Sequence, residues 1–317
     1  MGVARVKAAR NPLTVASVSL TLFATTLKKR SFLHVLGVDL GGGKGKKTAA
    51  ATLRVDARHG ATVVDLAPRP REVPLYDQSL LALLRGYGDD TLVAIDAPLT
   101  LPPCLRCQVP VCPGQADCVD ASVVQMRADA SSFGEGGRNF RRGKPQVTPY
   151  TQRATELRLF LERGITPREA LGQGTGPLAA RAAHLTRALA DRFRLNENLI
   201  EVSPKATLAA LGFMQRTRRH LHEREARAAV LEALSPELRF GPGVWREVCV
   251  QSDNLFDAVI AAYTGYLWAR DNWQAQLGPD ARPQEGWIWI PPQSAASGTP
   301  VPDADDEEPQ TDRVTAL

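Results

Sequence analysis

The sequence predicts an α/β fold in which helices flank one mixed sheet. Three short β-rich runs at 32–40, 48–56 and 62–66 are separated by turn residues. Leucines at helical spacing then predict a helix that ends at Gly86, and a fourth apolar run follows at 91–96. This β-β-β-α-β order predicts an antiparallel meander, with further strands joining it in the same sheet.

The second half of the chain is predicted to be mainly helical, with a fifth strand at 198–202. A long amphipathic helix is expected to begin at Ser252 and Asp253 and to end near Ala269, and 287–290 is a candidate closing strand. Four other helix starts are predicted where a hydroxyl residue precedes proline: Thr148-Pro149, Thr166-Pro167, Ser203-Pro204 and Ser235-Pro236.

Length and composition predict one globular domain over 32–291, with a cysteine-rich insertion at about 100–120. No run approaches the roughly 18 to 20 apolar residues that cross a bilayer, so we expect no membrane partner and a cytoplasmic location. Residues 1–31 are expected to be an unstructured extension, or the result of a start codon called too early, in preference to a secretory signal. Residues 292–317 are acidic and rich in Pro, Ser and Ala, which predicts disorder. The oligomeric state is left open.

Acidic residues stand at positions that predict a shared divalent-metal site. Asp39 and Asp96 each end an apolar strand, where a carboxylate is costly unless it caps a helix or binds a cation. Asp253 and Asp257 are four residues apart and therefore share one face of the late helix, while Glu201 lies within the fifth strand. Each alone is compatible with a cap or an ion pair. Together they predict bound Mg²⁺ or Mn²⁺.

Five segments, in order across nearly the whole body, resemble the predicted RNase H-like nucleases, also called domain of unknown function family 429. They are Gly37-Val38-Asp39-Leu40, Ala94-Ile95-Asp96-Ala97-Pro98-Leu99, Ile200-Glu201-Val202-Ser203-Pro204, 253–262 and Gly286-Trp287-Ile288-Trp289. The resemblance implies an RNase H-like mixed five-stranded sheet with flanking helices, to which this chain adds the cysteine-rich loop and extra helices. RNase H-like nucleases carry one carboxylate on the first strand, one at the end of the fourth, and one or two on a late helix. Asp39, Asp96, Asp253 and Asp257 fall in those places, although a fold does not fix a function.

Four of the five cysteines fall within one loop rich in Pro and Gly, as Cys104-x2-Cys107-x4-Cys112-x5-Cys118. This spacing suits a four-cysteine structural zinc site. An iron–sulfur cluster accepts the same ligands, and the absence of any metal is the third alternative. Clustered thiols in a long chain favour a metal clip in a reducing compartment over a disulfide framework.

The leading functional prediction is a metal-dependent phosphodiesterase acting on nucleic acid, in which Asp39, Asp96 and Asp257 hold the metal with help from Asp253 or Glu201. A noncatalytic nucleic-acid or nucleotide-binding module is the first alternative. The second is an ATP-binding protein of the actin-like or sugar-kinase type, because a glycine run follows the first strand. That run lacks the Gly-Lys-Ser/Thr ending of a phosphate loop, and no second Asp-x-Gly motif accompanies it.

Basic residues offer weaker predictions. Arg141, Arg142 and Lys205 are candidate contacts for substrate phosphates, although such residues also commonly form a solvated face. Arg153 and Glu156 are three residues apart in a predicted helix, which is typical of a simple surface pair.

Overall fold

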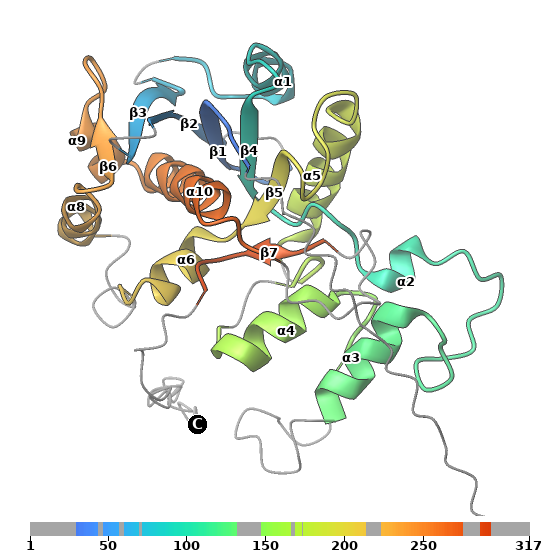
Figure 1. The fold of residues 1–317 in the computed structure, drawn as a ribbon. Helices are drawn as coiled ribbons and strands as arrows, with labels where there is room; N and C mark the ends of the chain where they lie inside the picture. The colour runs from blue at the N-terminus through green and yellow to red at the C-terminus, as the bar shows by residue number, and fades with distance from the viewer. Residues whose placement is uncertain are drawn as a thin grey trace, which may run out of the picture.

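A computed structural model describes residues 30–43, 47–56, 60–69, 72–131, 147–165, 169–172, 174–213, 223–274 and 286–292. Seven strands form one mixed sheet in the order β6-β3-β2-β1-β4-β5-β7 (Figure 1). Their bounds are β1 (His34–Asp39), β2 (Ala49–Asp56), β3 (Gly60–Ala67), β4 (Thr91–Asp96), β5 (Leu199–Val202), β6 (Leu238–Phe240) and β7 (Ile288–Trp289).

The first three strands form the predicted antiparallel meander, with β2 between β1 and β3. On the other side of β1, strands β4, β5 and β7 join in parallel, each to its neighbour. The sheet thus contains the five expected strands. β7 lies inside the predicted closing strand at 287–290, whereas β6, which pairs in parallel with β3, was not predicted. Three residues at a sheet edge are too short to show a recognisable period in sequence.

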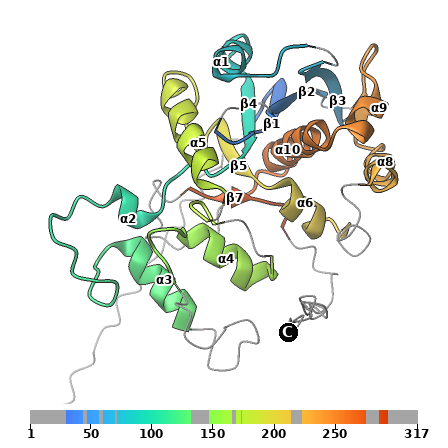
Figure 2. The same ribbon diagram turned by 180° about the vertical axis from the view of Figure 1, so that it is seen from behind.

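Helices cover both faces of the sheet. Helix α10 lies across one face with α6, α8 and α9 around it, and α1 and α5 cover the opposite face (Figures 1 and 2). The remaining helices, α2, α3 and α4, group together beside the β7 edge. The bounds are α1 (Asp77–Arg85), α2 (Pro103–Arg106), α3 (Ala121–Ser131), α4 (Ala154–Arg163), α5 (Gly176–Ala188), α6 (Pro204–Ala210), α8 (Arg224–Ala233), α9 (Arg246–Gln251) and α10 (Asp253–Arg270).

Helix α10 is the centre of the larger apolar core, because nearly every residue from Leu255 to Ala269 is buried. It packs directly on β1 at Gly37, where a side chain would not fit. A Cβ atom added to Gly37 would lie 2.1 Å from the carbonyl oxygen of Ala258 and 2.3 Å from the backbone nitrogen of Ala262. This close approach brings the helix axis onto the strand that carries Asp39. Among the described helices, none is long and apolar enough to cross a membrane.

Two of the predicted helix starts are confirmed in detail. The hydroxyl of Ser203 accepts a hydrogen bond from the N–H of Ala206, and Pro204 occupies the first position of α6. At the start of α10, the hydroxyl of Ser252 accepts from the N–H of Leu255. In both cases the side-chain oxygen satisfies a helix N–H that has no partner within the helix.

Two other predicted starts are wrong. Thr148 begins a turn, in which its hydroxyl lies 2.7 Å from that of Thr151, and α4 starts only at Ala154. Ser235-Pro236 lies in the turn between α8 and β6. A hydroxyl residue before proline favours a turn as well as a helix start, so the pair alone did not decide between them. Thr166-Pro167 lies outside the described residues.

The end of the predicted N-terminal extension contacts the body of the protein. Arg30 was assigned to the extension, but its guanidinium lies 3.7 Å from the ring centre of Trp268 and donates a hydrogen bond to the carbonyl oxygen of Trp273. These contacts tie the residue to the end of α10. Residues 1–29 and the predicted acidic tail from 293 lie outside the described part of the chain.

Candidate metal-binding carboxylate site

Asp39 and Asp96 are brought side by side by the sheet. They are the last residues of the adjacent parallel strands β1 and β4, and they are direct partners in the strand register. Both are half-buried. Two like charges at neighbouring strand ends repel each other unless positive charge or a shared proton offsets the repulsion. The register shows that the two strand-end aspartates, predicted from separate sequence motifs, are neighbours in the fold.

Both carboxylates belong to the face of the sheet that α10 covers. Val35 on β1 and Ala94 on β4 pack into the α10 core, whereas Leu36 and Ile95 pack into the core beneath α1 and α5. Side chains alternate between the two faces along a strand. Counting on in steps of two from Val35 and Ala94 places Asp39 and Asp96 on the α10 side.

Asp257 lies near the same end of the sheet. A Cβ on Gly265 would contact Val35, near the start of β1, while Ala258 contacts Gly37 further along the strand. Helix α10 therefore runs antiparallel to β1, and its first turns lie toward the strand ends. Asp257 immediately precedes Ala258 and is half-buried.

Asp253 is one turn earlier in α10 and is exposed. One of its carboxylate oxygens accepts a hydrogen bond from the N–H of Asn254 at 3.0 Å. It thus lies at the outer rim of the predicted site. Over the described ranges, no three His, Cys, Asp or Glu side chains are already arranged to hold a metal ion. The structure brings together Asp39 and Asp96, and it places the start of α10 beside them.

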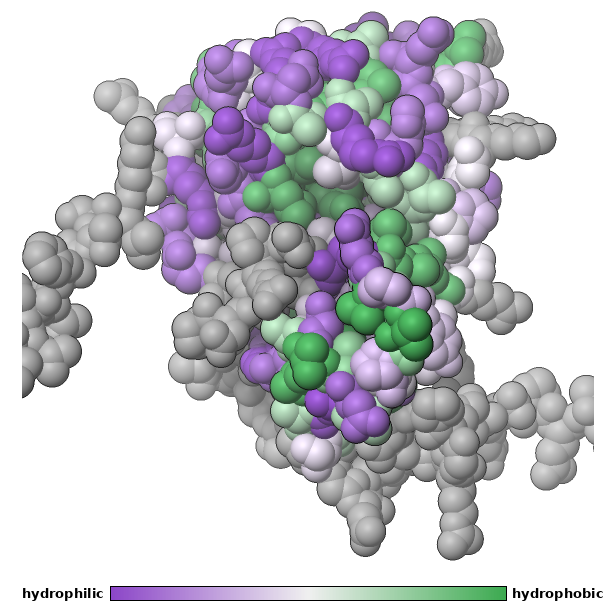
Figure 3. All heavy atoms as spheres, turned by 90° about the vertical axis from the view of Figure 1, so that its right-hand side faces the viewer, coloured by the Kyte–Doolittle hydropathy of each residue, from purple (hydrophilic) through white to green (hydrophobic). Residues whose placement is uncertain are grey.

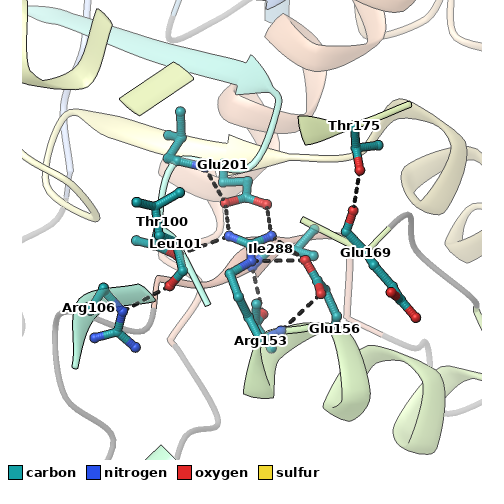
Figure 4. Close-up of polar contacts among 11 residues, drawn as sticks. Thr100, Leu101, Arg106, Arg153, Glu156, Glu169, Thr175, Glu201 and Ile288 are labelled. Carbon is teal, nitrogen blue, oxygen red and sulfur yellow. Dashed lines mark hydrogen bonds and ion pairs between the residues drawn. The ribbon is translucent and has the colours of Figure 1, made fainter. Parts of the chain in front are cut away.

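The predicted ligand role of Glu201 does not fit the geometry. Its Oε1 accepts a hydrogen bond from Arg153 at 2.6 Å, and its Oε2 accepts from Arg153 at 2.7 Å and from the N–H of Leu99 at 2.9 Å (Figure 4). Both oxygens are thus committed to a bidentate ion pair, the strongest geometry for such a pair. Only 3% of Glu201 is exposed. Glu201 therefore anchors the segment that follows β4 and is not available as a metal ligand.

Arg153 is the centre of this network, and its prediction as a surface residue is wrong. It is 1% exposed and Glu156 is 4% exposed. Besides Glu201, its guanidinium donates to Glu156 at 2.9 Å and to the hydroxyl of Thr100 at 3.0 Å (Figure 4). Burial lowers the pKa of Arg153, but the two carboxylates outweigh burial and raise that pKa above its ordinary value. Spacing within one helix could not reveal this role, because Glu201 is on another element.

A second buried arginine holds the turn after β1. Arg181, from α5, donates to the carbonyl oxygen of Gly41 at 2.7 Å and to the hydroxyl of Thr48, and its Nε donates to Asp77 at 2.7 Å. The N–H of Gly41 in turn donates to the Thr48 hydroxyl at 3.1 Å. The glycine run thus joins two antiparallel strands and does not lead into a helix as a phosphate loop does. No pattern near Arg181 in the sequence indicates this role.

Of the predicted phosphate contacts, Lys205 is exposed in the first turn of α6. Arg141 and Arg142 lie outside the described residues. Cys104, Cys107 and Cys112 are exposed and Cys118 is half-buried, and all four are free thiols.

A pocket of about 340 Å³ lies elsewhere, between α4, β7 and the segment after α10. Arg163 from α4 lines the pocket, and so do three tryptophan side chains, those of Trp273, Trp287 and Trp289. None of the predicted metal ligands contributes to its walls. The pocket is therefore a separate feature from the carboxylate site.

In a comparison with protein families, residues 37–282 match the family described as "Protein of unknown function (DUF429)". The matched range covers most of the chain and includes the second half of β1 with Asp39, all of β4 and all of α10. The chain belongs to the DUF429 family. This membership confirms the resemblance to domain of unknown function family 429, while the RNase H-like nuclease assignment stays a prediction. Searches of curated proteins and of solved structures give no match to this DUF429 protein.

Proposed function

We propose that this DUF429 protein is a metal-dependent phosphodiesterase with an RNase H-like fold that acts on nucleic acid. The observation that carries the proposal is the register pairing of Asp39 with Asp96 at the ends of adjacent parallel strands. The antiparallel meander continued by β4 and β5, with α10 across one face, supports the fold assignment. The resemblance requires carboxylates on the first strand, the fourth strand and a late helix, and these elements carry Asp39, Asp96 and Asp257.

The donor set fits a hard divalent cation. Asp39 and Asp96 supply carboxylate oxygens, which suit Mg²⁺ and Mn²⁺, and Asp257 is the third proposed ligand, with Asp253 at the rim. When bound, such an ion activates a water molecule and offsets negative charge on the phosphoryl oxygens. No nitrogen or sulfur ligand is needed. Glu201 is not a proposed metal ligand, because its carboxylate is already in an ion pair with Arg153.

The rest of the fold holds these carboxylates in place. β1 and β4 are central strands, and the main chain at Asp39 has strand partners on both sides, Ala49 and Asp96. The Gly37 contact lets α10 approach closely enough to carry Asp257 toward the strand ends. The Arg153–Glu201 ion pair fixes Leu99, three residues after Asp96. A site on rigid elements holds its ligands more precisely than one on loops.

A nucleic-acid substrate is proposed from the chemistry of the site and from a formal charge of +5, which favours a polyanion without requiring one. Exposed Lys205, two positions after Ser203 at the start of α6, remains a candidate phosphate contact. Cytoplasmic location stays a prediction.

The test is a screen of the purified chain against labelled DNA, RNA and junction substrates in Mg²⁺, in Mn²⁺ and in EDTA. Asp39→Asn and Asp96→Asn remove one proposed ligand each, and Asp89→Asn is the matched control because Asp89 is fully exposed at the other end of β4. We expect wild type to cleave nucleic acid only when Mg²⁺ or Mn²⁺ is present. Asp89→Asn should keep this activity, and Asp39→Asn and Asp96→Asn should lose it. Binding without cleavage would favour the noncatalytic alternative, and a thermal shift specific to ATP would favour the kinase-like one.

A further inference from the structure

Residues 104–120, which run from within α2 to the start of α3 and are called the loop below, have no apolar core of their own. Residues 104–120 are all described, and none of them belongs to the apolar clusters of the protein. Large apolar side chains are instead exposed, with Val111 at 81% and Val119 at 89%. Figure 3 faces this side of the molecule and shows apolar patches among polar ones on its surface. Ordering such a loop costs conformational entropy that apolar burial here does not offset.

Two backbone N–H groups in this loop point at cysteine sulfurs. The N–H of Val109 donates to Sγ of Cys107 at 3.5 Å, and the N–H of Gly114 donates to Sγ of Cys112 at 3.4 Å. Gly114 has a φ of +91°, a conformation that glycine adopts readily, so the chain can fold back over Cys112 at this point. An N–H donor stabilises the charged form of its acceptor, so this arrangement favours thiolates.

The four thiols belong to one short stretch of chain, and three of them are exposed. Thiolates brought together in one site repel one another unless a cation neutralises them. The buried Cys249 is remote from this loop, and burial raises its pKa to about 12.

Both ends of the loop are fixed to the body of the protein. The N–H of Cys104 donates to the carbonyl oxygen of Pro149 at 3.1 Å. At the other end, the guanidinium of Arg127 on α3 donates to the carbonyl oxygens of Gln115, at 2.6 Å, and of Ala116. The loop therefore has fixed ends and a middle without a core.

We propose that Cys104, Cys107, Cys112 and Cys118 bind one zinc ion, which closes the loop as a structural clip. Four thiolates complete a tetrahedral zinc shell and leave no open position for chemistry. Because no three such side chains in the described ranges are already arranged around an ion, binding draws the loop together, and closure is coupled to metal uptake. The clip uses soft sulfur ligands and is independent of the proposed carboxylate site.

The experiment uses the full chain, purified without chelator or histidine tag and reconstituted with zinc under reducing conditions. Bound zinc and iron are measured by elemental analysis in wild type, Cys107→Ser, Cys112→Ser and Cys249→Ala. The first two changes are on an exposed loop, and circular dichroism checks that each variant is folded. Trypsin cleavage after Arg106, where α2 ends and the loop begins, is followed with and without chelator.

We expect one zinc per chain in wild type and in Cys249→Ala, and loss of zinc in the two loop variants. Chelator should speed cleavage after Arg106 in wild type and leave the already zinc-free Cys112→Ser variant unchanged. The proposal is overturned if reconstituted wild type binds no zinc, if the loop variants keep it, or if iron and sulfide are found instead. None of these results depends on nuclease activity, so the two proposals fail separately.

Discussion

At the residue scale, the account depends on the different surroundings of two kinds of acid. Asp39 and Asp96 face each other at strand ends and are half-buried, whereas Glu201 is fully committed to Arg153. Asp39 and Asp96 are like charges at adjacent strand ends, whereas the negative charge of Glu201 is offset by Arg153. Substitutions at these positions should therefore have opposite effects on stability.

Asp39→Asn should leave the melting temperature in EDTA level or raised. Asn keeps the shape of Asp and removes one of two neighbouring like charges. Calorimetry in EDTA measures this directly, and added Mg²⁺ should stabilise wild type more than the variant. A variant that melts well below wild type in EDTA would mean that Asp39 is a structural residue.

Glu201→Gln should destabilise the fold by about 3–5 kcal/mol, because it leaves the charge of buried Arg153 partly uncompensated. The matched control is Glu197→Gln, whose ion pair with Arg194 is exposed and 3.9 Å long, and which should cost less than about 1 kcal/mol. Urea unfolding measures both, with and without Mg²⁺. If Glu201→Gln lowers the free energy of unfolding only when Mg²⁺ is present, then Glu201 is a metal ligand.

Residue roles were predictable where they depend on local sequence. Asp39 and Asp96 follow apolar strands, so their positions could be predicted from the pattern alone. Arg153 and Glu201 are on separate elements, and nothing near either residue in sequence indicates its partner. The same holds for Arg181, which holds the turn at Gly41 from α5.

At the element scale, the packing of α10 on β1 positions the site. This contact needs a glycine, because the nearest atoms to an added Cβ on Gly37 are backbone atoms of the helix. Backbone atoms cannot move aside as a flexible side chain can. The helix and its buried residues are fixed relative to the strand that carries Asp39.

Gly37→Ala should destabilise the protein by about 3 kcal/mol, the upper part of the usual range for overpacking. Gly42→Ala is a control in the turn just after the same strand, since nothing lies within 4 Å of an added Cβ there. Thermal and urea unfolding of the two variants should therefore differ clearly. Equal stability would show that α10 does not approach β1 as closely as described.

Elements were predictable to the extent that their signals were local and long enough. The four longer strands and α1 have clear apolar patterns, and the caps at Ser203 and Ser252 lie beside apolar runs. Helix α10 was predicted to be amphipathic, but it is buried on nearly all sides, so its long apolar run and its cap are what the sequence could reveal. Thr148 and Ser235 carry the same hydroxyl-proline signal but lie in turns. The three-residue strand β6 forms because it pairs with β3, and nothing in the sequence of β6 indicates that pairing.

At the scale of the whole molecule, the sheet and its two helical layers combine a meander with parallel strands, as the order of elements predicted. The group formed by α2, α3 and α4 lies beside the β7 edge, and the Arg153 network connects it to β5. Its placement was not predictable, since it depends on an ion pair between distant elements. In the function proposed above, β1, β4 and α10 together hold one divalent metal ion.

Mn²⁺ binding measured by titration calorimetry tests this claim most directly. The protein is first treated with chelator and dialysed, and wild type is compared with Asp39→Asn, Asp96→Asn and the exposed control Asp89→Asn. We predict that wild type and the control bind Mn²⁺, and that each site variant binds about tenfold or more weakly. The Cys112→Ser variant should bind as wild type does, because its sulfur belongs to the other proposed site. Equal Mn²⁺ affinity in wild type, Asp39→Asn and Asp96→Asn would contradict the account.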